Sequence, residues 1–248
     1  MTEILKTINL TKKFGGLIAV DDVSFKVEEG DVQSIIGPNG AGKSTFFRLI
    51  SGEHKPTGGE IIFDGQNITN LPQTAISHRG MAVAYQITNI FPMLTAMENV
   101  RVAAQSRLTT FNFWSRASSL ETLLDRTLDI LELTGVTEFK DEIAGNLSHG
   151  DQKRLEIGIA LATRPKLLLL DEPTAGLAPT ETRQVIELIK KIAQNLTIIL
   201  VEHKMKVVME VSDKITVLHY GRLLAQGSPD EIRANEEVRR VYLGGVKT

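Results

Sequence analysis

The chain has 248 residues, 42% of them hydrophobic, and a formal net charge of −2 at pH 7. This length can bury a sizeable core in one large domain, and the charge balance gives no indication of a nucleic-acid partner. The absence of cysteine excludes disulfide bonds and thiol catalysis. The N-terminus lacks the pattern of a signal peptide, and no apolar run reaches the roughly 18 residues of a membrane span. We therefore expect a soluble, cytoplasmic protein that reaches any membrane through a partner.

The N-terminal segment predicts β-structure. Residues 4–10 alternate apolar and polar side chains, as a half-buried strand does. Residues 12–16 predict a turn, and two further strands are predicted at 18–20 and 23–27. Phe14 is a candidate platform on which an adenine ring could stack, and an ordinary core phenylalanine is an equally good interpretation of this pattern.

The glycine-rich segment 37–45, GPNGAGKST, fits the phosphate-binding pattern G-x-x-x-x-G-K-[ST]. An apolar run at 32–36 predicts a buried strand before it, and residues 44–51 predict a helix after it. Glycines let the backbone bend so that consecutive N–H groups point at phosphate oxygens, and the helix dipole adds positive potential. We expect Lys43 to reach the β- and γ-phosphates and the Ser44 hydroxyl to bind Mg²⁺. The predicted nucleotide-binding residues of this loop are Gly37, Pro38, Asn39, Gly40, Ala41, Gly42, Lys43, Ser44 and Thr45.

The segment after the first helix predicts two more strands. Residues 56–60 predict a turn and 61–63 a short strand, and the apolar run at 81–85 predicts a strand that ends at Gln86. A glutamine at a strand end could contact Mg²⁺ or an attacking water. Considered alone, Gln86 is better explained as a surface residue.

From residue 87 the pattern becomes helical. Helices are predicted at 96–108 and 119–133, where leucines recur at helical spacing. These segments predict a mostly helical insertion over 87–163. The aromatic cluster at 109–115 is interpreted as local packing of this insertion in preference to a binding surface.

The second half of the chain contains the acidic candidates. Residues 166–171 form a continuous apolar run that ends at Asp171, followed by Glu172. Such a run suits a strand buried on both faces of a parallel sheet, and open α/β sheets bind ligands at the carboxyl ends of these strands. Asp171 is expected to hold Mg²⁺, and Glu172 is placed to accept a proton from water that attacks the γ-phosphate.

Another buried strand is predicted at 198–201 and is followed by His203, which could donate a hydrogen bond to the γ-phosphate. Alone, His203 would be better explained as a surface histidine. Residues 215–226 predict a final hairpin, and Ser228 begins a helix with proline in its first turn.

A second phosphate-binding helix start is predicted at residues 147–152, LSHGDQ. Ser148 and the unpaired N–H groups of the first turn would bind an anion there. The chain therefore has two such helix starts but only one combined lysine and Mg²⁺ site. A head-to-tail pair of chains explains this, because each would supply its second helix start to the nucleotide of the other.

The order of these motifs resembles the ATP-binding subunit of ABC transporters, and the similarity extends over essentially the whole chain. The resemblance implies an α/β fold with a P-loop NTPase (RecA-like) core of mainly parallel sheet, an N-terminal antiparallel β-subdomain and an inserted α-helical subdomain. It makes residues 1–248 one ABC-type ATP-binding domain. Within it, 1–86 and 164–248 would form the nucleotide-binding core with the β-subdomain, and 87–163 the helical subdomain.

The resemblance also implies roles for single residues. The implied catalytic residues are Lys43, Glu172 as general base and His203 as switch histidine. The implied Mg²⁺ ligands are Ser44, Gln86 and Asp171. The nucleotide contacts that it implies outside the phosphate loop are Phe14 on adenine, Gln86, and Ser148 and Gly150 on the partner's γ-phosphate. Gln86 would also couple the site to membrane subunits, and the cofactors would be ATP and Mg²⁺.

Three positions depart from the family pattern. The usual signature is L-S-G-G-Q, and here His149 and Asp151 replace a glycine and the glutamine. An added carboxylate near a phosphate site should oppose anion binding. Ala178 stands where many members have an aspartate that helps to couple the two sites, so we expect communication between the sites to differ.

Finer features resemble the larger ATPase subunit of bacterial branched-chain amino acid importers. They are the segments 14–17, 89–92, 97–100, 154–157 and 241–244. The chain would then hydrolyse ATP to power import of branched-chain amino acids, or of related small amides or urea, from the cytoplasmic face of the inner membrane. Its partners would be a second ATP-binding subunit, integral-membrane permease subunits and, indirectly, a periplasmic binding protein.

Several alternatives stay open at this point. The second ATPase subunit could be identical or different, and the resemblance favours a different one. A soluble ABC-type ATPase of translation or DNA repair is disfavoured by the single nucleotide-binding module and the absence of a basic tail. An ATPase of a lipid exporter would have the same architecture, and the segment 89–100 favours import.

Overall fold

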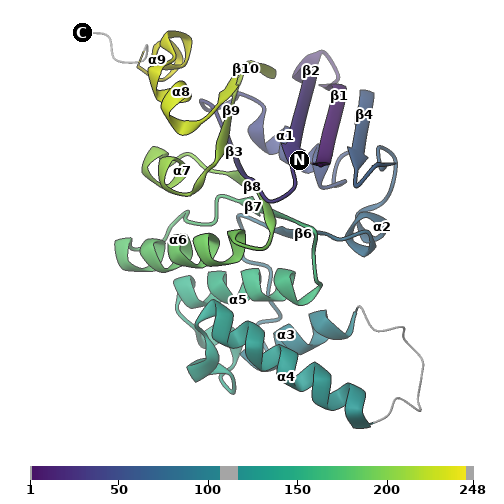
Figure 1. Cartoon of the computed structure of the whole chain (residues 1–248), viewed down its shortest axis with the longest axis vertical. Helices are drawn as coiled ribbons and strands as arrows, with labels where there is room; N and C mark the ends of the chain where they lie inside the picture. The colour runs from purple at the N-terminus through teal and green to yellow at the C-terminus, as the bar shows by residue number, and fades with distance from the viewer. Residues whose placement is uncertain (1, 107–116, 244–248) are drawn as a thin grey trace.

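The computed structural model describes residues 2–106 and 117–243. An antiparallel sheet and a group of helices lie at opposite ends of the long axis, with a larger, mainly parallel sheet between them (Figure 1). The α/β character and the two kinds of sheet therefore agree with the fold expected from the sequence. In the described part of the chain, none of the helices combines the length and apolar character needed to cross a membrane.

The smaller sheet has four strands in the order β2-β1-β4-β5. They are β1 (Glu3–Phe14), β2 (Leu17–Glu28), β4 (Gly58–Phe63) and β5 (Gln66–Asn67). The turn predicted at 12–16 is wrong in its first residues, because Lys12 and Lys13 still pair with β2. The two strands predicted at 18–20 and 23–27 are one strand, with Asp22 at a positive φ of 56°. The turn predicted at 56–60 also extends too far, because β4 begins at Gly58.

The larger sheet has six strands in the order β10-β9-β3-β8-β7-β6. They are β3 (Val32–Ile36), β6 (Met81–Ala84), β7 (Leu167–Asp171), β8 (Thr197–Val201), β9 (Lys214–His219) and β10 (Arg222–Gly227). All neighbours are parallel except β9 and β10, which form the predicted hairpin. Because the carboxyl ends of the parallel strands meet at one edge, the loops after β3, β6, β7 and β8 are neighbours there.

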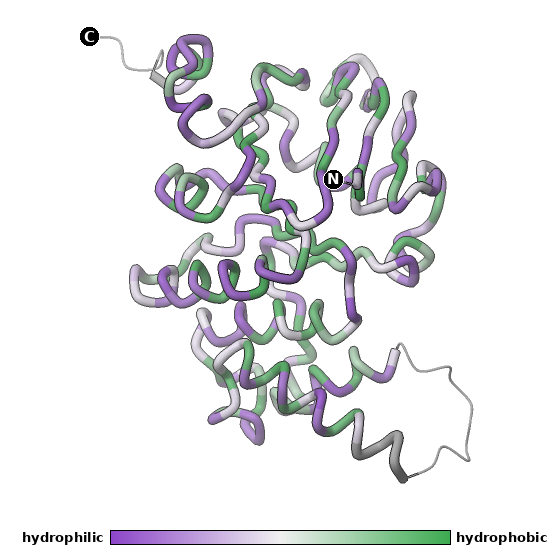
Figure 2. Tube along the Cα trace, viewed as in Figure 1, coloured by the Kyte–Doolittle hydropathy of each residue, from purple (hydrophilic) through white to green (hydrophobic). Residues whose placement is uncertain are grey.

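Helices cover both faces of the larger sheet. The helices of the described residues, of which α3 and α4 pack with α5, are α1 (Lys43–Ile50), α2 (Gln73–His78), α3 (Ala96–Gln105), α4 (Ala117–Thr134), α5 (His149–Ala162), α6 (Pro179–Ala193), α7 (Met205–Val211), α8 (Pro229–Ala234) and α9 (Glu236–Leu243). Phe46 and Phe47 of α1 belong to an apolar cluster that takes residues from both sheets. A second cluster joins α6 to the opposite face of the larger sheet. Helix α6 and the coloured part of helix α4 alternate hydrophobic and hydrophilic colours, as amphipathic helices do (Figure 2).

Helices α3, α4 and α5 share an apolar cluster that includes Val100, Leu131 and Leu155. They fall within the range 87–163, and the division of the chain at these residues stays a prediction. The aromatic cluster predicted at 109–115 lies outside the described residues. Short 3-10 turns at Thr137–Phe139 and Ala144–Asn146 lead from α4 into α5.

Candidate active site

The phosphate-binding loop is closed by its own lysine. The Lys43 ammonium donates to the carbonyl oxygens of Gly37 at 2.8 Å and of Pro38 at 3.0 Å, so it lies across the loop between β3 and α1. Gly42 caps α1 with a φ of 96°, and a Cβ at this position would overlap the carbonyl oxygen of Ala19. The sequence needs glycine here both for the left-handed backbone and for the close approach of β2.

Two carboxylates stand side by side at the end of β7. Burial raises the pKa of Asp171 to about 6, and the neighbouring charge of Glu172 adds to the effect. Burial also lowers the pKa of Lys43, while the negative charges of Glu172 and Asp171 oppose that shift. The lysine and the two acids therefore belong to one electrostatic site, as the sequence predicted.

Two side chains that follow the neighbouring strands β6 and β8 approach the carboxylate of Glu172. Its Oε2 accepts a hydrogen bond from Nε2 of Gln86, after β6, at 3.0 Å. The same oxygen lies 3.4 Å from Nδ1 of His203, after β8. Its backbone N–H donates to the Val201 carbonyl at 2.8 Å, and Glu172 itself adopts a positive φ of 45°. The structure thus brings Gln86, Glu172 and His203 together, and the turn at Glu172 aims its carboxylate between the other two.

The buried carboxylate of Glu202 organises the backbone around this site. It accepts hydrogen bonds from the backbone N–H groups of His203 at 2.9 Å, Lys204 at 3.1 Å and Thr174 at 3.3 Å, and from the Thr174 hydroxyl. The sequence analysis assigned no function to Glu202. An acid directly after a buried strand is the signal that could have found it.

Phe14 is not a core residue. Its side chain is 45% exposed at the end of the β1–β2 hairpin, with the ring edge-on to His54 at a centroid distance of 5.7 Å. The Lys12 ammonium lies 4.9 Å from the ring centroid. The same hairpin approaches the phosphate loop at Gly42. An exposed ring on the hairpin that approaches the phosphate loop favours the adenine-platform interpretation over core packing.

The second helix start is capped as predicted, but its charges are arranged differently. Ser148 is the N-cap of α5, and its Oγ accepts from the Asp151 N–H at 3.1 Å. The Ser148 hydroxyl donates to the Asp151 carboxylate at 2.6 Å. That carboxylate also forms an ion pair with Arg154, and both side chains are largely buried. The negative charge expected to oppose an anion at this site is therefore compensated within the helix.

Glu181 links this helix start to the segment after β7. One carboxylate oxygen accepts from the Gly150 N–H at 3.0 Å, and the other accepts from the Ala178 N–H at 3.0 Å. These two backbone bonds lower the pKa of Glu181. Ala178 has no side-chain oxygen to accept from the first N–H groups of α6, and Glu181 supplies the other half of a capping box by accepting from the Ala178 N–H. Glu181 was not predicted as a functional residue, although proline followed two residues later by an acid is a helix-start pattern.

The two halves of the predicted nucleotide site do not meet within one chain. Across the described ranges, no hydrogen bond or ion pair joins Ser148 or Gly150 to the phosphate loop. In the same ranges, no group of three or more acidic or histidine side chains could hold a metal ion.

Comparison with known proteins shows which family this chain belongs to. The ABC transporter family model matches residues 20–175, and the model of the branched-chain amino acid ATP-binding cassette transporter matches residues 222–248. The chain belongs to the ABC transporter family. This ABC ATPase is 44% identical to the high-affinity branched-chain amino acid transport ATP-binding protein BraF of Pseudomonas aeruginosa, over 97% of this chain and 98% of that protein. It is 43% identical to LivG of Salmonella typhimurium, over 98% of this chain and 99% of that protein.

Solved structures agree with this assignment. A nucleotide-free ATP-binding cassette from an ABC transporter matches with a TM-score of 0.84 at 30% identity, over 97% of this chain and 99% of that one. Another cassette, in its ADP conformation, matches with a TM-score of 0.84 at 31% identity, over 98% of this chain and 100% of that one. The P-loop NTPase fold and the ATPase activity predicted from the sequence are confirmed.

Replacing Asp171 with asparagine should change the pH dependence of stability. In the native chain its pKa is about 6, whereas an unfolded aspartate titrates at roughly 3.9. The native state therefore binds this proton more tightly, and the contribution of Asp171 to the free energy of unfolding falls as pH rises from about 4 to about 6. We expect Asp171→Asn to gain stability relative to wild type across this range and to keep the gain above it.

The measurement is urea unfolding at closely spaced pH values, without nucleotide and with EDTA. Asp129→Asn on α4 serves as the control for loss of an exposed carboxylate. A difference between wild type and Asp171→Asn that is the same at low and neutral pH would contradict the prediction.

Proposed function

We propose that this ABC ATPase powers the import of branched-chain amino acids, or of related small amides or urea, at the cytoplasmic face of the inner membrane. The observation that carries the proposal is the meeting of Gln86, Glu172 and His203 beside Lys43, in a chain 44% identical to BraF. The match of residues 222–248 to the branched-chain amino acid cassette model supports this substrate class.

Glu172 is the proposed general base. Its Oε2 is held by Gln86 and lies near His203, so the carboxylate has a fixed orientation at the edge of the sheet. A carboxylate so placed can accept the proton of a water that attacks the γ-phosphate. His203 is the proposed donor to that phosphate, and Lys43 the proposed contact to its oxygens.

The residues proposed as Mg²⁺ ligands suit that ion. Ser44, Gln86 and Asp171 offer oxygen atoms, which Mg²⁺ prefers. Burial and the charge of Glu172 raise the pKa of Asp171 by more than the charges of Arg48 and Lys153 lower it, and a divalent ion would relieve the remaining unfavourable negative charge. When bound, Mg²⁺ would neutralise negative charge on the β- and γ-phosphates.

The proposed working unit is a head-to-tail pair of ATPase subunits, either two copies or two different chains. Support comes from the separation of Ser148 and Gly150 from the phosphate loop within one chain. Each chain would present its α5 helix start to the γ-phosphate held by its partner. The Gly150 N–H is already bonded to Glu181, so an arriving phosphate would compete with that carboxylate.

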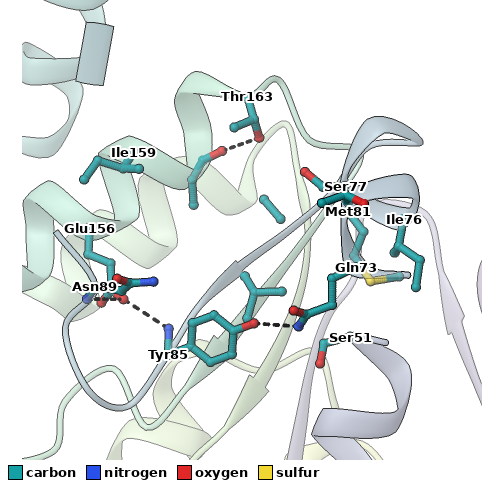
Figure 3. A pocket seen from close by; sticks show the side chains of 14 residues that line it. Ser51, Gln73, Ile76, Ser77, Met81, Tyr85, Asn89, Glu156, Ile159 and Thr163 are labelled. Carbon is teal, nitrogen blue, oxygen red and sulfur yellow. Dashed lines mark hydrogen bonds between the residues drawn. The ribbon is translucent and has the colours of Figure 1, made fainter. Parts of the chain in front are cut away.

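A groove beside Gln86 is the proposed docking site for the permease. A cavity of about 300 Å³ lies between α2, β6 and α5 (Figure 3). It shares Gln73, Tyr85 and Asn89 with a second cavity of about 410 Å³ that extends to Gln86 and Asp171. Apolar side chains at Ile87 and Met93 are 85% and 82% exposed close by along the chain. An apolar segment of a membrane subunit docked here would lie next to a proposed Mg²⁺ ligand.

Affinity capture from native membranes tests the importer. The tagged wild-type chain should recover integral-membrane subunits, a second ATPase unless the pair is homodimeric, and a periplasmic binding protein, identified by mass spectrometry. Ile87→Asp/Met93→Asp should recover far less of the membrane subunits, because a charge would be buried in the groove. Leu124→Asp, at an exposed apolar residue of α4 outside the groove, is the control. Recovery of soluble partners alone would refute the importer.

Substitution of Glu172 with glutamine tests the proposed base. We expect ATP hydrolysis to fall by at least about 100-fold, since a positioned general base contributes that much or more. ATP binding, measured with a fluorescent analogue, should be retained because the phosphate loop is unchanged. Glu187→Gln, at an exposed glutamate of α6, is the control. Hydrolysis near the wild-type rate would rule out Glu172 as the base.

Substitution of Glu181 with glutamine tests the competition at Gly150. In a Glu172→Gln background, Glu181→Gln should reduce the ATP concentration needed for subunit association by about fivefold. That factor corresponds to about 1 kcal/mol, a typical effect of a charge near a helix N-terminus. Analytical ultracentrifugation of the assembled ATPase pair over an ATP titration measures it. Glu187→Gln removes the same charge from the same helix and should have no effect, and an equal shift in both would contradict competition.

A further inference from the structure

We propose that Lys153 and Glu156 of α5 are positioning residues that hold the segment 85–89 and thereby set how Gln86 meets Glu172. The inference rests on the proposed catalytic role of Glu172 and extends it to a helix outside the nucleotide site. In the described residues, neither side chain is hydrogen-bonded to the phosphate loop or to the two carboxylates at the end of β7, and the charge of Lys153 acts on Asp171 only by lowering its pKa.

Lys153 and Glu156 form an ion pair in the interior, where a charged side chain is less stable than in water. The side chains of Lys153 and Glu156 are each 4% exposed, and Nζ lies 2.8 Å from Oε2. Removing both charges from water is so unfavourable that apolar residues of similar size would often stabilise the fold as well or better. Stability of α5 alone therefore does not account for an ion pair at this position.

The remaining hydrogen bonds of the pair all go to backbone atoms on either side of Gln86. Oε1 of Glu156 accepts from the Tyr85 N–H at 3.2 Å and from the Asn89 N–H at 3.0 Å (Figure 3). The Lys153 ammonium donates to the Tyr85 carbonyl oxygen. Both ends of the short segment that carries Gln86 are therefore fixed by the same two side chains.

The sheet does not fix this segment. Strand β6 lies at the end of the larger sheet and ends at Ala84, and no strand of the described residues pairs with its outer edge. In the described stretches, no backbone–backbone hydrogen bond outside helices and strands involves residues 85–89. The bonds to Glu156 and Lys153 take the place of the backbone hydrogen bonds that a neighbouring strand would supply. A movement of α5 would therefore move Gln86.

The position of the pair joins three features of the molecule. Glu156 lines the cavity proposed to receive the permease, together with Tyr85 and Asn89. Helix α5 begins at the Ser148 cap, which is proposed to face the partner's nucleotide. The other end of the connection is the bond from Gln86 to Glu172. The pair thus transmits a shift of α5, from either surface, to the proposed base.

Two charge-neutral double variants separate positioning from stability. Lys153→Met/Glu156→Leu removes the ion pair and every acceptor for the segment. Lys153→Met/Glu156→Gln removes the same charges but keeps a side-chain oxygen for the Tyr85 and Asn89 N–H groups. Neither variant leaves a buried charge unpaired, so both should fold, and urea unfolding verifies this.

Hydrogen exchange on the full chain is the first measurement. In the leucine variant the amides of Tyr85 and Asn89 should exchange at least about tenfold faster than in wild type, since each loses a part-buried hydrogen bond to a charged acceptor. In the glutamine variant they should stay protected. This measurement needs neither nucleotide nor partner. Its result therefore does not depend on whether the proposed importer function is correct. Unchanged protection in the leucine variant would overturn the proposal.

ATP hydrolysis by the complex captured from membranes is the second measurement. The leucine variant should lose about tenfold in kcat with little change in KM for ATP, because the change affects the orientation of Gln86 and not the phosphate loop. The glutamine variant should recover most of that loss. Equal loss of kcat in both variants, or loss that follows the free energy of unfolding, would reduce the pair to a structural role and overturn the proposal.

Discussion

Asp171 and Glu172 are adjacent carboxylates at the end of a strand of buried leucines, and their repulsion is the interaction around which the site is built. Burial and mutual charge raise the pKa of Asp171 to about 6. The nearby groups respond to this excess of negative charge. The Lys43 ammonium stays close despite the unfavourable effect of burial, and Gln86 and His203 both turn nitrogen atoms toward Glu172. A site that concentrates negative charge in this way favours a nucleotide that brings its own cation.

Away from that pair, other buried or half-buried carboxylates have a mechanical role. Glu202 binds backbone N–H groups of the loops after β7 and β8. Glu181 binds those of Gly150 and Ala178, and Glu156 binds those of Tyr85 and Asn89. Glu156 and Glu181 are helix residues and Glu202 directly follows β8, and each accepts from at least one backbone N–H of a segment outside its own element. Charge-assisted bonds of this kind are stronger than neutral ones, so the loops follow the elements that hold them.

These connections bear on the departures from the family pattern. Asp151 is paired with Arg154, which removes the expected conflict with an anion at the Ser148 cap. Ala178 lacks an aspartate, but its backbone N–H is held by the same carboxylate that holds Gly150. The helix start of α5 and the segment before α6 are therefore linked within the chain. Communication between the proposed sites can use this link in place of the missing side chain.

The sequence by itself determined where along the chain the buried strands and the phosphate-binding loop lie. The apolar runs before Gly37 and after Lys166 predicted buried strands, and the glycine pattern fixed the phosphate loop. These features are local, because a period or a glycine at a left-handed position is visible in neighbouring residues. Asp151 and Arg154 were also within reach of local reasoning, since they lie three positions apart on one helix.

The tertiary structure alone decided how the loops are held. The β1–β2 hairpin is longer than predicted, because pairing with β4 and the close approach of Ala19 to Gly42 extend it past the local turn signals. The partners of Glu156, Glu181 and Glu202 were not predictable, although each acid is plain in the sequence. Their partners are backbone N–H groups, which every residue except proline carries, so no side-chain pattern marks which ones a distant carboxylate will reach.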